Sequence, residues 1–189
     1  ALFMYESDPK VASVHGYVYP IDGLPETFFI RGADCWGWGT WKRAWDVFEK
    51  NGNRLLETLT KKNLQYEADF NGSFGYTQML KDQIGGKNNS WAIRWYMSAF
   101  LNEMLTLYPG KSYVKNIGFD SEGTHCRKNG ELFSAGLNFN CEFFKIRTIE
   151  NQEARKKFEA FFRALRPSLI RRCFLFVERL IRAIATKKK

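Results

Sequence analysis

Alternating apolar and polar positions predict several short β-strands along the chain. The strongest alternation ends at Pro20, and a second apolar run leads into a glycine-rich turn. Two later runs are separated by the turn signal Pro109-Gly110. The predicted strands are residues 11–19, 27–30, 105–108 and 113–117, with a weakly alternating hairpin over 132–149.

Hydrophobic positions that recur three and four residues apart predict helices between and after these strands. Asn88, Asn89 and Ser90 offer N-caps for one of them, and Pro167 breaks or kinks the last helical run. The predicted helices are the end of one in 1–7, then 40–50, 54–62, 74–83, 91–104, 150–166 and 169–184. Strands interleaved with helices indicate an α/β fold.

The most unusual stretch is a glycine-rich turn that holds four of the six tryptophans within ten residues. Trp36 and Trp38 lie among glycines, where no regular element can bury both, so we expect them to line a small-molecule pocket rather than the core. Trp41 and Trp45 lie four apart on the predicted helix 40–50, a spacing typical of a core-facing stripe. The sequence therefore predicts a pocket wall before this helix and core packing within it.

Basic residues are concentrated at the carboxyl-terminal end. The chain of 189 residues has a formal net charge of +9, from 29 Lys and Arg against 20 Asp and Glu. Residues 150–189 hold twelve of the cations and four Glu, a charge of +8, which leaves +1 for residues 1–149. A nucleic-acid-binding domain normally spreads positive charge over one face of its fold, so this distribution argues against that role for the body of the chain.

Cysteine spacing argues against a zinc site, and hydropathy argues against a transmembrane helix. Cys35, Cys126, Cys141 and Cys173 have no Cys-x-x-Cys spacing and no paired His, so we expect no zinc site and take reduced thiols as the default. No run of eighteen or more apolar residues predicts a transmembrane helix, and no signal peptide is visible. The chain begins at Ala1 within a helical pattern and without an initiating Met, so we expect it to be a piece of a longer protein.

Four separate stretches, taken together and in order, resemble one family. They are Val-His-Gly-Tyr-Val-Tyr-Pro (14–20), Cys-Trp-Gly-Trp-Gly-Thr-Trp-Lys-Arg-Ala-Trp (35–45), Ser-Trp-Ala-Ile-Arg-Trp-Tyr (90–96) and Asn-Ile-Gly-Phe-Asp-Ser-Glu-Gly-Thr-His-Cys (116–126). In this order they resemble the later half of bacterial family 2-like glycosyltransferases with the GT-A fold, which act on cell-surface polysaccharides. The resemblance covers residues 1–149.

The resemblance implies an α/β fold in residues 1–149, a partial GT-A sheet that is Rossmann-like and mixed, with flanking helices. Residues 150–189 are then a basic, amphipathic C-terminal helical tail. In the family, an amino-terminal half binds the nucleotide-sugar and carries the Asp-x-Asp carboxylates that hold Mg²⁺ or Mn²⁺. This sequence has no Asp-x-Asp, so it looks like the acceptor-side half without the donor half.

The implied function is that of a transferase in polysaccharide biosynthesis, of the inverting kind. Such an enzyme moves a sugar from a nucleotide-sugar donor to a cell-surface polysaccharide or lipid-linked acceptor, with a divalent metal, Mg²⁺ or Mn²⁺, in the complete protein. The fragment alone can be inactive because the donor half is missing. The alternative is a non-catalytic, membrane-associated carbohydrate-binding module, since the tryptophans are kept while Asp-x-Asp is not.

Inverting transfer needs one carboxylate that takes the proton of the acceptor hydroxyl. Asp34, at the mouth of the Trp turn, is the candidate base, and its alternative role is that of a turn or cap residue. Related enzymes tend to carry the base at the start of the helix after the acceptor loop, where this chain has Asn88, Asn89 and Ser90 and no carboxylate. Sugar rings stack on Trp while sugar hydroxyls bond to polar side chains. The substrate-binding candidates are therefore Trp36, Trp38, Asn89, Trp91 and Arg94.

Two of the polar candidates keep alternative roles. His125 lies in a glycine-flanked loop beside Asp120 and Glu122. Neutral imidazole binds Mn²⁺ and softer metals, and the resemblance implies that a late His completes the metal shell, although an ordinary hydrogen bond is the alternative. Arg94, next to Trp95, can face a diphosphate or a packed carboxylate, and we favour the structural role.

The tail combines a broad apolar face with a cationic one. Leu and Ile dominate the first and Arg the second, and three Lys end the chain. Such a helix fits the surface of an anionic membrane, so we expect a cytoplasmic protein, peripheral at the inner face of the cell membrane. The alternatives are packing of the apolar face on the domain and, more weakly, an RNA or DNA arm, although nucleic acid is not an expected partner.

Overall fold

The computed structural model describes residues 1–115, 136–137 and 143–165. The helix predicted over 169–184 and the metal-ligand candidate His125 lie outside the described residues, as does most of the hairpin predicted over 132–149. The strand predicted over 113–117 is described only to residue 115, and residues 113–115 form no strand. None of the described helices combines the length and the apolarity that a bilayer crossing requires.

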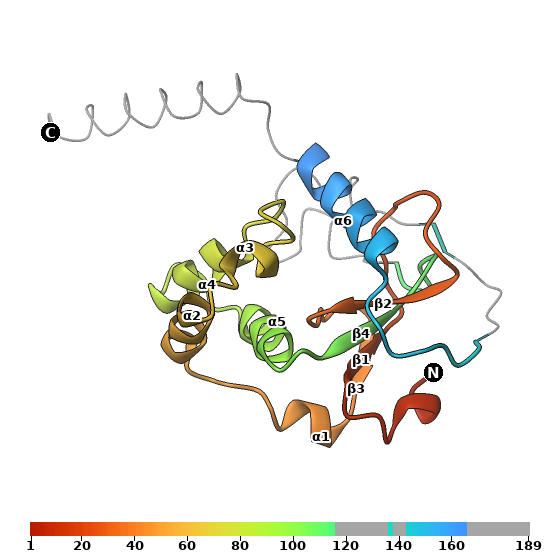
Figure 1. Ribbon diagram of the computed structural model, residues 1–189, viewed down its shortest axis with the longest axis horizontal. Helices are drawn as coiled ribbons and strands as arrows, with labels where there is room; N and C mark the ends of the chain where they lie inside the picture. The colour runs from red at the N-terminus through yellow and green to blue at the C-terminus, as the bar shows by residue number, and fades with distance from the viewer. Residues whose placement is uncertain (116–135, 138–142, 166–189) are drawn as a thin grey trace, which may run out of the picture.

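Four strands form a mixed sheet in the order β2-β4-β1-β3 (Figure 1). The strands are β1 (Val11–His15), β2 (Thr27–Arg31), β3 (Trp38–Thr40) and β4 (Leu105–Pro109). β1 and β4 run parallel, whereas β2 pairs antiparallel with β4 and β3 pairs antiparallel with β1. The predicted α/β class is confirmed as a four-stranded mixed sheet with flanking helices.

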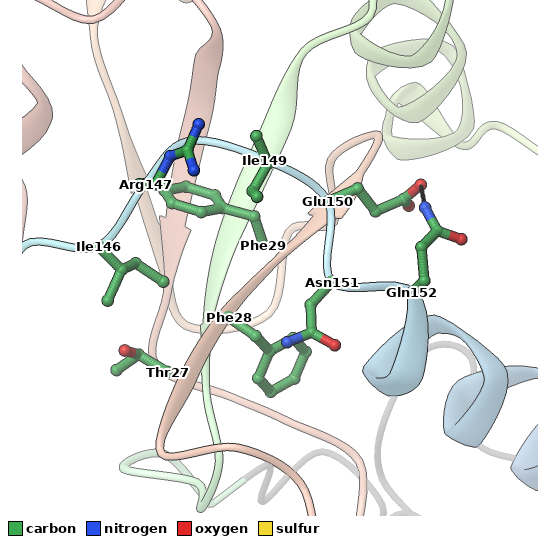
Figure 2. A pocket seen from close by; sticks show the side chains of 9 residues that line it. All are labelled: Thr27, Phe28, Phe29, Ile146, Arg147, Ile149, Glu150, Asn151 and Gln152. Atoms are coloured by element: carbon green, nitrogen blue, oxygen red, sulfur yellow. Dashed lines mark hydrogen bonds between the residues drawn. The ribbon is translucent and has the colours of Figure 1, made fainter.

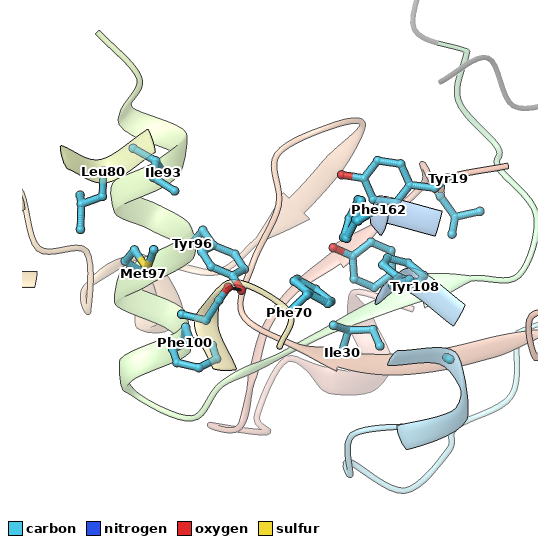
Figure 3. Close-up of a cluster of buried hydrophobic side chains, with 14 of the residues drawn as sticks. Tyr19, Ile30, Phe70, Leu80, Ile93, Tyr96, Met97, Phe100, Tyr108 and Phe162 are labelled. Atoms are coloured by element: carbon cyan, nitrogen blue, oxygen red, sulfur yellow. Dashed lines mark hydrogen bonds between the residues drawn. The ribbon is translucent and has the colours of Figure 1, made fainter. Parts of the chain in front are cut away.

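Alternate residues of each strand face two different layers, as the strand period requires. Phe28, Ile30 and Tyr108 face the helices and join the main core (Figure 3). Phe29 and Leu107 face the opposite side, which the 3-10 turn η1 (Phe3–Tyr5) and part of the segment 143–149 cover. The helices are α1 (Lys42–Trp45), α2 (Gly52–Lys61), α3 (Gln65–Ala68), α4 (Tyr76–Ile84), α5 (Trp91–Leu101) and α6 (Gln152–Ala164).

Polar N-caps fix where the longer helices begin. The side chain of Asn51 accepts hydrogen bonds from the amides at the start of α2, and the Ser90 hydroxyl accepts one from the amide of Ile93 in α5 at 3.4 Å. Asn151 caps α6 in the same way, through the amide of Ala154 at 2.9 Å. These bonds satisfy amides that the helix itself leaves unpaired. The helices predicted over 54–62, 74–83 and 91–104 are confirmed, with small shifts at their ends.

α6 belongs to the core of the same fold. Phe158 and Phe162 are each 1% exposed and contact the rings of Tyr19 and Phe70. The apolar face of α6 is therefore covered by the domain, which is the packing alternative for this part of the predicted tail. Residues 166–189 lie outside the described part of the chain.

Several predicted elements are shorter than expected because the sheet captures their ends. Thr40 pairs with Ser13 of β1, so the helix predicted over 40–50 begins only at Lys42 and ends at Trp45. The strand predicted over 11–19 ends at His15. The predicted Trp turn contains β3, and residues 63–71, between two predicted helices, contain α3; the sequence pattern indicated neither element.

Candidate functional site

The turn between β2 and β3 crosses the sheet and carries the predicted catalytic residue. Its first glycine, Gly32, donates its amide to the carbonyl of Met104 and accepts a bond from the Thr106 hydroxyl at 2.8 Å. At the other end, the carbonyl of Gly37 accepts the amide of Gly16 at 2.6 Å. The turn therefore passes from the beginning of β4 to the carboxyl end of β1.

Asp34 lies half-buried near the middle of this turn. Its Oδ1 accepts the amide of Cys35 at 2.7 Å, and its Oδ2 accepts a long bond from the Tyr19 hydroxyl at 3.4 Å. Burial, aided by the charge of Asp34, raises the pKa of the Cys35 thiol to about 12. Burial also raises the pKa of Tyr19 and of Tyr108, and the Asp34 charge adds to both shifts. The carboxylate thus faces a set of neutral phenols.

Trp36 packs beside Asp34 on the main core. Its ring lies 5.0 Å from the ring of Tyr17 and 6.4 Å from that of Tyr19, measured between centroids. Trp36 is half-buried, so it is neither interior nor fully open to solvent. Asp34, Trp36, Tyr19, Tyr108 and His15 lie around one point, and we call these five residues the Asp34 site.

Trp38 points away from the Asp34 site. Gly37 between the two tryptophans has a φ of +55°, and a Cβ there would lie 2.6 Å from Val114 Cγ2, so only glycine fits this change of direction. The ring of Trp38 lies 6.0 Å from the rings of Trp91 and Trp95, measured between centroids. The expectation that Trp36 and Trp38 form one pocket wall is wrong, because the left-handed glycine sends their rings into different clusters.

The second cluster is partly open to solvent. Its members are Trp38, Trp45, Trp91 and Trp95, which we call the tryptophan cluster. Trp95 is fully buried, but Trp45 is 37% exposed and Trp91 42% exposed. The prediction that Trp45 lies in the core is therefore wrong: α1 is a single turn at the surface, and Trp45 covers Trp95 from outside.

The start of α5 brings the other candidates to this cluster. Asn89 is exposed just before Ser90. Arg94 donates from Nη1 to the carbonyl of Lys50 at 2.8 Å, and its guanidinium lies 5.8 Å from the ring of Phe48. These contacts tie α5 to the loop after α1, as expected of a structural arginine.

Sequence reasoning gave no functional role to His15, the last residue of β1. It is 2% exposed, and its ring lies 4.8 Å from that of Tyr108 at an angle of 51°. Burial lowers the pKa of His15, and the nearby Asp34 opposes that shift. Among the described residues neither ring nitrogen makes a hydrogen bond of good geometry, although the backbone of Asp34 lies near enough to oppose the pKa shift as well. The sequence signal was the position itself, a histidine at the end of an otherwise apolar strand.

Three surface hollows lie away from the Asp34 site. Figure 2 shows one of about 340 Å³ beside β2, where Phe29 and Ile149 form its apolar part and Glu150 bonds to Gln152. A second hollow, of about 430 Å³, lies between α2 and the end of α5, and a third, of about 450 Å³, lies between residues 21–26 and 110–113. None of their lining residues belongs to the predicted site.

Within residues 1–115, 136–137 and 143–165, no three His, Cys, Asp or Glu side chains come together as a metal-binding group. The Oδ1 of Asp34 is already held by the amide of Cys35 at 2.7 Å. The described residues therefore do not fit a complete metal site. No protein-family model matches this chain, and comparison with curated proteins and with solved structures gives no significant match.

Proposed function

We propose that this chain is the acceptor-side part of an inverting glycosyltransferase of the GT-A kind. It transfers a sugar from a nucleotide-sugar donor to a cell-surface polysaccharide or a lipid-linked acceptor. The observation that carries the proposal is Asp34, a carboxylate held among aromatic rings near the carboxyl ends of the parallel strands β1 and β4. Open α/β sheets bind their ligands at such strand ends. The Rossmann-like assignment of the sheet is part of the same proposal.

Asp34 acts as the general base in this proposal. The amide of Cys35 fixes Oδ1, whereas Oδ2 accepts, from the described residues, only the long bond of the Tyr19 hydroxyl. Oδ2 is therefore the oxygen that takes the proton of the acceptor hydroxyl. Trp36 offers a ring on which the acceptor sugar stacks, and the surrounding phenols stay neutral, so they add no charge beside the base.

The donor and its metal belong to the half that this sequence lacks. A divalent metal, Mg²⁺ or Mn²⁺, supplies positive charge to the leaving diphosphate when bound. The described residues hold no metal-binding group, so no step here runs through the metal. His125 stays a proposed ligand of that metal, outside the described residues.

The test compares Asp34→Asn with Asp46→Asn in the full-length protein that carries this chain. With Mg²⁺ or Mn²⁺ and a panel of nucleotide-sugars, Asp34→Asn should lower the transfer rate by about 10²–10⁴-fold, the usual contribution of a general base. Asp46 is exposed and pairs with the exposed Lys42, so its variant should keep the rate. If the unaltered protein neither binds nor hydrolyses any of the donors, the proposal is contradicted. If the Asp34→Asn variant is fully active, the role of Asp34 is contradicted.

The tryptophan cluster favours a second candidate, a non-catalytic, membrane-associated carbohydrate-binding module. Trp45 and Trp91 expose ring surface that can stack on a sugar, and their rings lie 5.9 Å apart. Glycan binding with no nucleotide-sugar binding in the full-length protein supports this candidate over the enzyme. Trp91→Ala should then weaken glycan binding, while Tyr66→Ala, which removes an exposed ring elsewhere, should not.

We further propose that the tail attaches the protein to the cytoplasmic face of the cell membrane. The apolar face of α6 is already packed, so the attachment rests on residues 166–189, beyond the described part. Deleting residues 166–189 should abolish binding to vesicles that contain anionic lipid and leave the fold intact. Unchanged vesicle binding, with loss of nucleic-acid binding, supports the RNA or DNA arm instead.

A further inference from the structure

The surface hollow between residues 21–26 and 110–113 lies at the carboxyl end of β4, the strand that runs parallel to β1. Residues 110–113 follow β4 directly. Residues 21–26 precede β2, whose antiparallel direction brings its start to the same end of the sheet (Figure 1). Open α/β sheets bind their ligands in crevices at such strand ends. The volume of the hollow, about 450 Å³, falls in the range of about 300–1,000 Å³ that is typical of small-molecule pockets.

The two walls of this hollow are fixed relative to each other. The amide of Gly110 donates to the carbonyl of Glu26 at 2.7 Å, and a Cβ on Gly110 would collide with the carbonyl oxygen of Pro25. From α6, Lys157 Nζ donates to the carbonyl of Asp22 at 3.3 Å. The hollow is therefore formed before any ligand enters, and binding there does not have to order the loops.

Gly16 joins the hollow to the turn that carries the Asp34 site. Its carbonyl accepts the amide of Tyr113, which lines the hollow, at 2.7 Å. Its own amide donates to the carbonyl of Gly37 at 2.6 Å, and Gly37 directly follows Trp36. The hollow and the Asp34 site are thus separate places that share one stretch of backbone.

The polar lining of the hollow is accessible and balanced in charge. Asp22, Glu26 and Lys111 are all exposed, and within the described part of the chain no ion pair uses either carboxylate. The ammonium of Lys157 lies beside Gly23, which also lines the hollow. Two carboxylates and two ammonium groups favour neither a cation nor an anion, but they offer both hydrogen-bond acceptors and donors.

We propose that this hollow binds an uncharged sugar unit of the acceptor glycan, beyond the unit that reacts at Asp34. The inference rests on the proposed function and adds a second sugar site to it. Hydroxyl groups of the sugar donate to the carboxylates and accept from Lys111, and hydrogen bonds to charged groups are the stronger kind. Leu24 and Tyr113, both half-buried in the lining, offer apolar surface to the C–H groups of the ring.

Nuclear magnetic resonance of the backbone amides tests the binding directly on the 189-residue chain. Methyl β-glucoside and cellotriose are the uncharged probes, and glucosamine and glucuronate carry one charge of either sign. We expect saturable shifts of the Gly23 and Gly110 amides with the uncharged probes at millimolar concentration. No shift with any probe overturns the inference. Binding of a charged sugar about tenfold tighter than methyl β-glucoside overturns the assignment to an uncharged unit.

Substitutions locate the site. The double change Asp22→Ala with Glu26→Ala should weaken binding of cellotriose about tenfold or more, the loss expected when charged acceptors are removed. Both side chains are exposed, so the fold should be kept. Glu57→Ala is the matched control, because Glu57 is an exposed carboxylate that lines the hollow beside α2. Unchanged binding by the double variant overturns the inference.

Transfer assays in the full-length protein separate this inference from the proposed function. The double variant should raise KM for a trisaccharide acceptor about tenfold, while kcat and the KM for a monosaccharide acceptor stay unchanged. An equal rise of KM for both acceptors overturns the second sugar site and leaves the proposed function standing. If the unaltered protein transfers to no acceptor, the proposed function fails, and the amide shifts still decide whether the hollow binds a sugar.

Discussion

Two groups of buried polar side chains lie on the same sheet and are satisfied in opposite ways. Beside β2, Arg155 donates to the carboxylate of Glu150 at 2.9 Å and to the carbonyl of Glu67 at 2.7 Å. Glu159 lies 3.5 Å from the same guanidinium and also accepts from Asn71. At the carboxyl end of β1, by contrast, His15 is equally buried, and its ring nitrogens make no hydrogen bond of good geometry with the described residues.

The paired group holds the last helix to the sheet. Glu150 Oε1 accepts the amide of Arg31 in β2 at 2.9 Å as well as Arg155, so one carboxylate joins the strand to α6. The Arg155 guanidinium also lies 4.8 Å from the ring of Phe70. Every charge here is used for assembly. His15 takes no part in such a network, so the two groups contribute to assembly in different ways.

Of the changes that test this comparison, Arg155→Met should lower the free energy of unfolding most. The change leaves Glu150 buried without its cation and leaves Glu159 with Arg163 alone, and breaking such a buried pair costs about 3–5 kcal/mol of unfolding free energy. Urea unfolding followed by tryptophan fluorescence measures this loss. Lys42→Met is the matched control, because the exposed Lys42–Asp46 pair should contribute about 0–1 kcal/mol. Equal effects of the two changes contradict the assembly role of the paired group.

Periodicity predicted those parts of the fold in which one element carries its own signal. α2 and α5 have N-caps in Asn51 and Ser90, and β4 is an apolar run before Pro109-Gly110. For α6, periodicity predicted an apolar face but not what covers it, because its partners Tyr19 and Phe70 are distant in the sequence. Such long-range contacts leave no local pattern.

The sequence predicted several members of the site but not which of them lie together. Asp34 and Trp36 do lie together, but the direction of Trp38 depends on the positive φ of Gly37, which composition alone does not indicate. β3 was missed because Trp38–Thr40 becomes a strand only by pairing with β1.

A smaller loss of stability is expected for a substitution in the turn after β2, which joins this strand to the Asp34 site. Gly32 has a φ of +98°, and a Cβ there would lie 2.6 Å from Tyr96 Cε2. Gly32→Ala should therefore cost about 3 kcal/mol from backbone strain and overpacking. Gly86→Ala is the control: its φ is +71°, but nothing lies within 4 Å, so only the strain of about 1 kcal/mol remains. Thermal unfolding of both variants measures the difference, and equal losses contradict a tightly packed turn.

The smallest effect concerns the environment that Asp34 and burial create for Cys35. Its pKa of about 12 lies above the ordinary 9.0, so the native thiol stays protonated at pH values where the unfolded chain loses the proton. The unfolded chain therefore gains stability relative to the native state as the pH rises from about 9 to 12. The contribution of the Cys35 thiol to the free energy of unfolding is present below about pH 9 and is lost over that range. With the other three cysteines changed to Ser, the rate of iodoacetamide alkylation against pH should rise only near the upper end of the range. Asp34→Asn should move that rise to lower pH by the lesser part of the shift, because burial is the larger cause. A profile that Asp34→Asn does not move places the Asp34 charge away from Cys35 and removes one support for a carboxylate acting inside the Asp34 site.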